Sequence, residues 1–300
     1  GAVFWMWVSA ILGMCTKFTE VTLAVHFRER NRHGDYVGGP MYYIKNGLGK
    51  NWRFLAVLYS AFGVLTVFGT GNATQVNTIT TAIDTALINF NVISESSTGR
   101  LNLILGIVIT LLVGMVLLGG IKRIGSVSEK LVPFMALFYI VLALGVVILN
   151  IGRVPAVFHD IVYGAFNPSA VTGGVVGTMI VSMQKGVARG IFSNEAGLGS
   201  APIAAAAAQT KEPVRQGLVS MTGTFIDTIV ICTMTGLSIV LTGAWQVEGL
   251  EGVQVTTYAF QHGLPIPGQI SAFVLMICLV FFAFTTILGW DYYSERIPDR

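Results

Sequence analysis

Charged residues are scarce in this chain. Only 11% of its 300 residues are Asp, Glu, Lys or Arg, and 53% are hydrophobic. Charged residues make up about 25% of an ordinary soluble domain, so the scarcity excludes that class and predicts an integral membrane protein. The formal net charge of +3 is small and by itself indicates no particular partner.

Residues that build disulfide, metal or catalytic centres are few as well. Cys15, Cys232 and Cys278 lie inside apolar runs, which is typical of small buried residues and not of a disulfide set or a metal site. The four histidines have no metal-ligand spacing, and no nucleophile–base pair can be argued. We therefore expect neither an enzyme nor a protein with a cofactor.

An initiator Met and a signal peptide are also absent, and residue 1 falls at the start of an apolar stretch long enough to span a membrane. We therefore expect residues 1–300 to form a single transmembrane domain that is truncated at both ends.

Seven apolar segments are long enough to cross a bilayer, which takes about 20 residues of helix. They are Ala2–Val25, Phe54–Ile83, Leu101–Gly119, Leu131–Ile151, Val171–Ala207, Gln216–Gly243 and Gln269–Trp290. Basic residues gather in alternate connections, and the connection after the first segment has Arg28, Arg30, Arg32, Lys45, Lys50 and Arg53. Because basic loops stay in the cytoplasm, the N-terminus is predicted outside and the C-terminus inside.

The fifth segment, Val171–Ala207, changes character near its middle. It begins apolar and then becomes polar and glycine-rich at Ser182, Gln184, Lys185, Gly186, Arg189 and Gly190. Backbone that leaves the helix inside a bilayer must line a cavity, and a helix broken at mid-span is typical of a solute site. We favour this broken helix over a straight helix that ends at Gln184 and continues as a cytoplasmic loop. After the break, Pro202 and the run Ala204–Ala208 predict a new cytoplasmic helix.

The second segment contains GTGNATQVNTIT, which is too polar to face lipid throughout. Asn72 and Gln75 are three residues apart and share one helix face. Hydrogen bonds that hold helices together would explain these residues, and so would the polar wall of a solute site. Both interpretations stay open.

Three further charged residues lie within predicted spans. Lys17 and Glu20 are three residues apart on the first segment, and we interpret them as a structural pair. Asp227 lies near the middle of the sixth segment, where a charge is a candidate functional residue by default. An ion or proton role is one interpretation. We favour a hydrogen-bonded structural carboxylate that caps a helix or pairs with Lys185 or Arg189.

The last segment contains two adjacent hydroxyls, Thr285 and Thr286, in apolar surroundings. Oxygen ligands suit a hard cation such as Na⁺. Thr286 and Trp290 are four residues apart and share a helix face. On spacing alone, threonines that bond back to the preceding turn are the favoured interpretation.

Five stretches together resemble one family: GGPMYYIKNGLG, GTGNATQVNTIT, KGVARGIFSNEAGLGSAPIAAAAAQT, PVRQGLVSMTGTFIDTIVICTMTGL and TTILGWDYY. Over essentially the whole chain they are similar to the sodium:alanine (alanine or glycine:cation) symporters of prokaryotes. The resemblance implies an all-α membrane protein of the leucine-transporter type, with two inverted five-helix repeats. Members have about eleven spans, of which this chain matches the second to the eighth. The first helix, which supplies half of the site in such folds, is missing, so we expect this piece to be inactive alone.

The resemblance also implies a function and a set of site residues. The function is sodium-coupled symport of alanine or glycine by alternating access, in the inner (plasma) membrane of a prokaryotic cell. The expected partners are the amino acid, Na⁺ as coupling ion and membrane lipid, with no nucleic acid. Residues that would border the substrate are Asn72, Gln75, Met183, Gln184, Val187, Thr286 and Trp290. Thr285 and Thr286 would complete the Na⁺ site, Trp290 would limit side-chain size, and Gly186 and Gly190 would let the half-helix bend.

Two other classes stay open. A proton-coupled amino-acid carrier would use Asp227 or Glu195 in place of the threonine site. A channel-type or purely structural membrane module would show unsaturable flux or none.

Overall fold

The computed structural model describes residues 1–32, 34–166 and 178–297. The chain divides into two compact units. Unit 1 contains residues 1–64, 155–233 and 295–300, and unit 2 contains residues 65–154 and 234–294.

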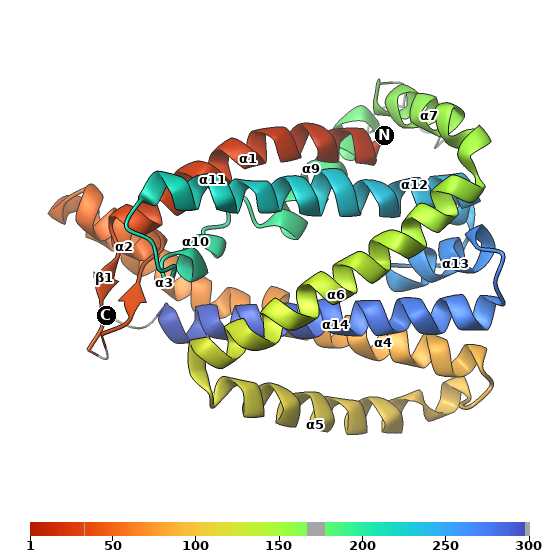
Figure 1. Cartoon of the computed structure of the whole chain (residues 1–300), viewed down its shortest axis with the longest axis horizontal. Helices are drawn as coiled ribbons and strands as arrows, with labels where there is room; N and C mark the ends of the chain where they lie inside the picture. Colours follow the sequence, from red (N-terminus) through yellow and green to blue (C-terminus); the bar gives the residue numbers. More distant parts are fainter. Residues whose placement is uncertain (33, 167–177, 298–300) are drawn as a thin grey trace. The chain divides into compact units, whose positions relative to one another are not determined.

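Unit 1 is organised around its first helix. α1 (Ala2–His26) packs lengthwise against α9 (Thr178–Asn194) and α11 (Pro213–Thr224), as Figure 1 shows. A two-stranded antiparallel hairpin, β1 (Glu29–Arg30) and β2 (Tyr36–Val37), follows α1, with Glu29 opposite Val37. The remaining elements are α2 (Pro40–Gly47), η1 (Lys50–Trp52), α3 (Arg53–Thr66), α7 (Val154–Phe166), α10 (Ala201–Ala205) and the π-helical segment η5 (Phe225–Cys232).

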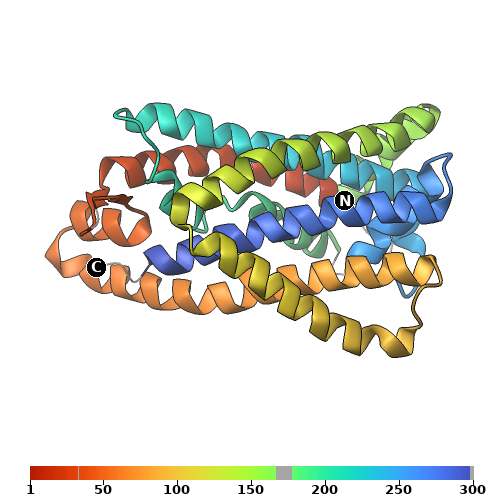
Figure 2. The same ribbon diagram turned by 60° about the horizontal axis from the view of Figure 1, so that its bottom comes forward.

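Unit 2 is built from long antiparallel helices. The chain can be followed in Figure 2 from α4 (Thr74–Asn89, orange) through α5 (Thr98–Leu117, gold) into α6 (Gly120–Leu149, yellow-green). α5 packs against both α4 and α6, and α13 (Val253–Gly263) also packs against α4 and α6. The other elements are the π-helical segment η2 (Val67–Ala73), η3 (Glu95–Ser97), η4 (Ile151–Arg153), α12 (Thr233–Thr242), η6 (Ala244–Gln246) and α14 (Gly268–Arg296).

Six helical stretches in the described ranges are long and apolar enough to cross a membrane. They are Ala2–His26, Lys50–Asn89, Thr98–Leu117, Gly120–Leu149, Pro213–Thr242 and Gly268–Arg296, and each overlaps one predicted segment. The predicted all-α membrane protein is thereby confirmed. The fifth span stays a prediction, because residues 171–177 of that segment lie outside the described ranges. The inverted-repeat fold also stays a prediction.

The predicted break between Ser182 and Gly190 is wrong. α9 is one continuous helix from Thr178 to Asn194. Its glycines permit close packing on α1: a Cβ on Gly186 would lie 2.3 Å from the Ala2 carbonyl oxygen, and one on Gly190 would lie 3.2 Å from Ser9 Oγ. Small residues let helix backbones approach each other in membranes. A glycine-rich stretch therefore marks a helix contact here, not a bend.

The helix predicted after this segment forms, but it is short. α10 begins at Ala201 with Pro202 in its first turn, as predicted, and ends at Ala205. The guanidinium of Arg28 donates to the carbonyl oxygens of Ala206 and Ala208, at 3.0 and 2.7 Å, and to that of Thr210. Carbonyls at a helix end need such donors, so this arginine ties the end of the alanine run to the segment after α1.

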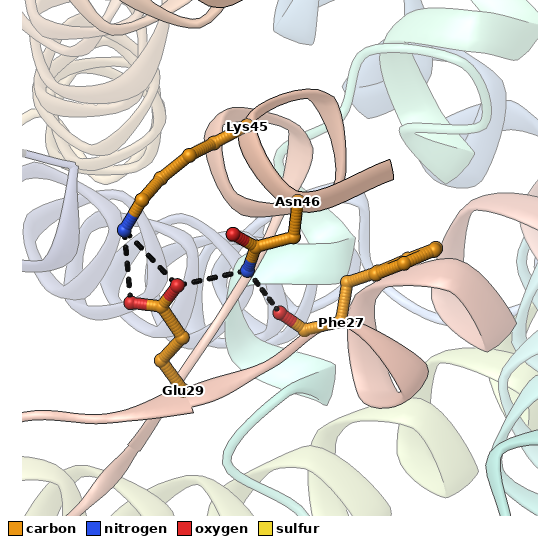
Figure 3. Close-up of polar contacts among 4 residues, drawn as sticks. All are labelled: Phe27, Glu29, Lys45 and Asn46. Carbon is orange, nitrogen blue, oxygen red and sulfur yellow. Dashed lines mark hydrogen bonds and ion pairs between the residues drawn. The ribbon is translucent and has the colours of Figure 1, made fainter. Parts of the chain in front are cut away.

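A second contact anchors the same segment (Figure 3). The carboxylate of Glu29 accepts hydrogen bonds from Lys45 Nζ at 3.0 Å and from Asn46 Nδ2 at 2.8 Å, and Asn46 also donates to the Phe27 carbonyl at 3.2 Å. Burial alone would raise the pKa of Glu29. The hydrogen bonds from Asn46 and Lys45 outweigh burial and hold this pKa below its ordinary value. The contact joins the β-hairpin to α2.

We predict that coupling between Glu29 and Lys45 depends on pH. A carboxyl with a lowered pKa adds stability above its ordinary pKa, and this stability is lost as the pH falls through the folded-state pKa. A double-mutant cycle of Glu29→Gln and Lys45→Gln in the full-length protein, followed by thermal unfolding, is expected to give about 0.5 kcal/mol at pH 7 for this exposed pair. The coupling should fade as the pH falls below 4.5. Lys50→Gln in place of Lys45→Gln is the control, and coupling that grows on acidification would contradict the assignment.

We also predict that Gly186→Ala destabilises the full-length protein. The added methyl would lie 2.3 Å from the Ala2 carbonyl oxygen and 2.8 Å from Trp5 Cβ. Overpacking of this kind costs about 1–3 kcal/mol, so the thermal unfolding midpoint should fall. The matched control is Gly106→Ala on α5, whose Cβ would meet nothing within 4 Å, and it should leave the midpoint unchanged or raise it. Equal midpoints for both variants would contradict the close contact of α1 with α9.

Candidate functional site

Each unit contains a cluster of polar groups inside its spanning helices that includes predicted site residues. In both places a helix contains a π-helical segment, η2 in unit 2 and η5 in unit 1. A π-helical turn widens the helix locally and frequently occurs at functional sites. The predicted residues Asn72 and Asp227 lie in these two segments.

In unit 2, η2 lies directly against α14. Gly71 faces the ring of Trp290 so closely that a Cβ on Gly71 would lie 2.6 Å from Trp290 Cγ. The next residue, Asn72, donates from Nδ2 to Asp291 Oδ1 at 2.8 Å. Gly71 contacts Trp290 and Asn72 contacts Asp291, so the two predicted site residues Asn72 and Trp290 lie close together on facing segments.

Sequence reasoning missed Asp291. The predicted span ended at Trp290, which placed Asp291 outside the membrane, whereas α14 continues to Arg296. The helix continues because the residues after Trp290 pack inside the protein: Tyr292 is only 2% exposed. An acidic residue directly after an apolar run was the available signal.

The two threonines of α14 bond back to their own helix, as their spacing favours. Thr285 Oγ1 donates to the carbonyls of Phe281 and Phe282 at 3.0 Å, and Thr286 Oγ1 donates to Phe282 at 2.8 Å. A hydroxyl that donates its one hydrogen keeps two acceptor lone pairs. The back-bonds therefore fix both oxygens without using their capacity to bind a cation, and the Na⁺ role stays a prediction.

The remaining predicted residues fall in both units. Gln75 is half-buried in α4 of unit 2. In unit 1, Met183 and Gln184 are exposed on α9, and Val187, one turn along from Met183, is half-buried. Their convergence on one substrate stays a prediction.

In unit 1, Lys17 and Glu20 do not form the predicted pair. No ion pair within 4.0 Å joins them in the described ranges, although each is only 7% exposed. Lys17 Nζ donates to the carbonyl of Asn194 at 2.9 Å, and Glu20 Oε1 accepts from the backbone N–H of Gly197 at 3.3 Å. The negative end of the α9 dipole favours the ammonium, and a free loop amide favours the carboxylate.

Asp227 is a hydrogen-bonded carboxylate, as favoured, but its partners differ from the predicted ones. Its two oxygens accept from Ser193 Oγ at 3.0 Å and Thr228 Oγ1 at 2.9 Å, and within the described residues no ion pair joins it to Lys185 or Arg189. Thr228 also accepts from Asn194 Nδ2 at 3.0 Å. The basic residues of α9 are exposed, and two neutral hydroxyls, those of the exposed Ser193 and the buried Thr228, stabilise Asp227 instead.

The comparisons with known proteins agree with the early resemblance. The family model described as the sodium:alanine symporter family matches residues 1–298. The chain is 54% identical to an uncharacterized transporter of Haemophilus influenzae, covering 99% of this chain and 62% of the relative. It is 45% identical to the sodium/alanine symporter AgcS of Methanococcus maripaludis, with the same coverage, and 37% identical to the probable sodium/glutamine symporter GlnT of Bacillus subtilis, covering 98% and 58%. The chain thus spans about six-tenths of the length of these relatives.

We predict that Thr228→Val destabilises the full-length protein by about 1–3 kcal/mol, because Asn194 and Asp227 each lose a buried hydrogen-bond partner at constant side-chain shape. The thermal unfolding midpoint measures the effect. Thr222→Val is the control, since Thr222 is exposed and, among the described residues, its hydroxyl bonds to the Val219 carbonyl of its own helix. A loss as large in the control as in Thr228→Val would show that the buried network is not responsible.

Proposed function

The chain belongs to the sodium:alanine symporter family, and from this we propose that the protein carries alanine or glycine across a prokaryotic cell membrane together with Na⁺. The observation that carries the proposal is the family match over residues 1–298. The relative named a sodium/alanine symporter supports alanine as the substrate. The relative named a probable sodium/glutamine symporter shows that substrate size must be argued from this chain's own residues.

A small substrate is supported by the rigidity of Trp290. Trp290 as a whole is 8% exposed, and its ring lies against Gly71 and meets the ring of Tyr293 edge-on at a centroid distance of 5.4 Å. An aromatic ring held from two sides cannot swing away from a larger side chain. We propose that it excludes branched side chains by overlap, as selective sites commonly do.

Na⁺ binding is supported by the oxygens of Thr285 and Thr286. Their hydrogens are directed to helix carbonyls, so the lone pairs of both oxygens are available to a hard cation. Asn72, Gln75, Met183, Gln184 and Val187 would complete the surroundings of the amino acid. Coupling follows if Na⁺ and the amino acid both bind one conformation of the protein more tightly than the alternative conformation. Bound Na⁺ then increases the affinity for the amino acid, and the bound amino acid increases the affinity for Na⁺.

We predict saturable uptake of labelled alanine that requires Na⁺. The measurement uses liposomes that contain the full-length protein, an inward Na⁺ gradient and an equal K⁺ gradient as control. Glycine should compete and leucine should not, because the pocket is small. Uptake that is independent of Na⁺ would refute sodium coupling, and competition by leucine would refute the role of Trp290.

A proton-coupled carrier is the second candidate, favoured by the half-buried carboxylate of Asp227, whose hydrogen-bond partners Ser193 and Thr228 are neutral. Asp227→Asn separates the two candidates in the same assay. A sodium symporter should keep its dependence on the Na⁺ gradient in this variant, whereas a proton-coupled carrier should lose uptake driven by a pH gradient.

A further inference from the structure

Asp291 has no role in the function proposed above, yet it lies inside a spanning helix. It is half-buried and stands in α14 between Trp290 and Tyr292, which are 8% and 2% exposed. Ionisable residues within a membrane span are costly and usually serve an ion or substrate. Its surroundings therefore indicate what it binds.

The neighbours of Asp291 offer no positive charge. Its Oδ1 accepts a hydrogen bond from Asn72 Nδ2 at 2.8 Å, and in the part of the chain that the structure describes no basic side chain forms an ion pair with it. An ionised Asp291 therefore has no counter-ion among the described side chains, and a bound cation would supply one.

Asn72 contributes a second oxygen that has no partner. Its Oδ1 is buried, and no donor among the described residues reaches it. Buried acceptors are almost always satisfied in native proteins, and strain, a water molecule or a bound ion explains an exception. Beside the Asp291 carboxylate, a cation would satisfy both groups. A carboxylate and an orphaned amide carbonyl, with no further donor required, are the ligands of a hard cation.

The backbone of η2 holds these two residues in place. Because Gly71 has no side chain, Trp290 can lie directly on the π-helical segment, where a Cβ would come within 2.6–2.8 Å of three Trp290 atoms. This contact fixes α14 beside η2 and places Asp291, the residue after Trp290, against Asn72, the residue after Gly71. The pair belongs to a single compact unit, so it is preorganised within that unit.

We propose that the carboxylate of Asp291 and the carbonyl oxygen of Asn72 bind Na⁺ at a site separate from Thr285 and Thr286. Asp291 lies five residues beyond Thr286, about 7.5 Å along the helix axis, so the two oxygen sets are distinct. The one carboxylate supplies a single negative charge, which matches a monovalent ion, whereas Ca²⁺ sites use several carboxylates among six to eight oxygen ligands. The inference rests on the proposed function and adds a second ion site to it.

The test is the Na⁺ dependence of alanine uptake by liposomes containing the full-length protein, with K⁺ keeping the ionic strength constant. Asp291→Asn should raise the half-saturating Na⁺ concentration at least tenfold, while the half-saturating alanine concentration at saturating Na⁺ stays within twofold. Glu295→Gln is the matched control. It removes an exposed carboxylate one turn further along the same helix, and it should keep the wild-type Na⁺ dependence.

A second measurement, the effect of Na⁺ on thermal unfolding, tests the site even if Asp291→Asn folds but does not transport. In detergent and without alanine, Na⁺ should raise the thermal unfolding midpoint of the wild type and of Glu295→Gln above that in K⁺, and Asp291→Asn should lose most of this shift. A wild-type Na⁺ response in Asp291→Asn would overturn the proposal. Weaker alanine binding by Asp291→Asn with unchanged Na⁺ dependence would also overturn it, because that result would assign Asp291 to the ammonium group of the substrate.

The two proposals fail in different ways. If wild-type uptake ignores Na⁺, the proposed function fails, whereas a Na⁺-specific thermal shift that only Asp291→Asn loses would still support the site. If wild-type uptake requires Na⁺ and Asp291→Asn behaves as the wild type does, the proposed function stands and the second site is refuted.

Discussion

The hydrogen bond from Lys17 to the last residue of α9 is the interaction on which unit 1 depends. A buried ammonium without a partner would be strongly unfavourable, and here it neutralises the carbonyl end of a helix at 2.9 Å. Three residues further along α1, Glu20 accepts from the loop that follows α9. Removing either side chain would deprive the α9 end or its loop of a hydrogen-bond partner on α1. Lys17 and Glu20 therefore position the α9 end and its loop on α1, each through its own backbone contact, and Asn194 also bonds to Thr228, which bonds to Asp227.

The same helix, α1, is also approached closely by two others. Gly186 of α9 comes within contact of Ala2 and Trp5, and a Cβ on Gly217 of α11 would lie 2.9 Å from the Phe18 carbonyl oxygen. Lipid tails are as apolar as leucine, so helices in a membrane associate through close packing and polar contacts and not through the hydrophobic effect. The glycines at the contacts of α1 with α9 and α11 supply the close packing. The buried charges of α1, Lys17 and Glu20, supply the polar contacts.

Each unit combines a π-helical segment with a carboxylate. In unit 1 the carboxylate is Asp227, which lies within η5 and has neutral hydroxyl partners. In unit 2 it is Asp291, which lies opposite η2 and has one amide partner. The two differ in what remains unsatisfied, because Asp227 accepts at both oxygens, whereas beside Asp291 a buried carbonyl has no donor. This difference is why the second pair, and not the first, points to a bound cation.

The sequence by itself determined the membrane class, the approximate bounds of six spans and the helix start at Pro202. These follow from bilayer thickness, hydrophobicity and local backbone preferences, which each segment expresses alone. It also located Asn72, Asp227 and Trp290 as residues of interest, because polar, charged and large aromatic groups stand out against an apolar background. The partners of these residues could not be read in this way, since spacing along one helix does not reveal the neighbouring helix. Only the tertiary structure decided that Lys17 turns to Asn194 instead of Glu20, that Gly186 marks a contact instead of a break, and that Asp291 lies inside a helix against Asn72. Each of these outcomes depends on which backbone groups another helix presents at the point of contact.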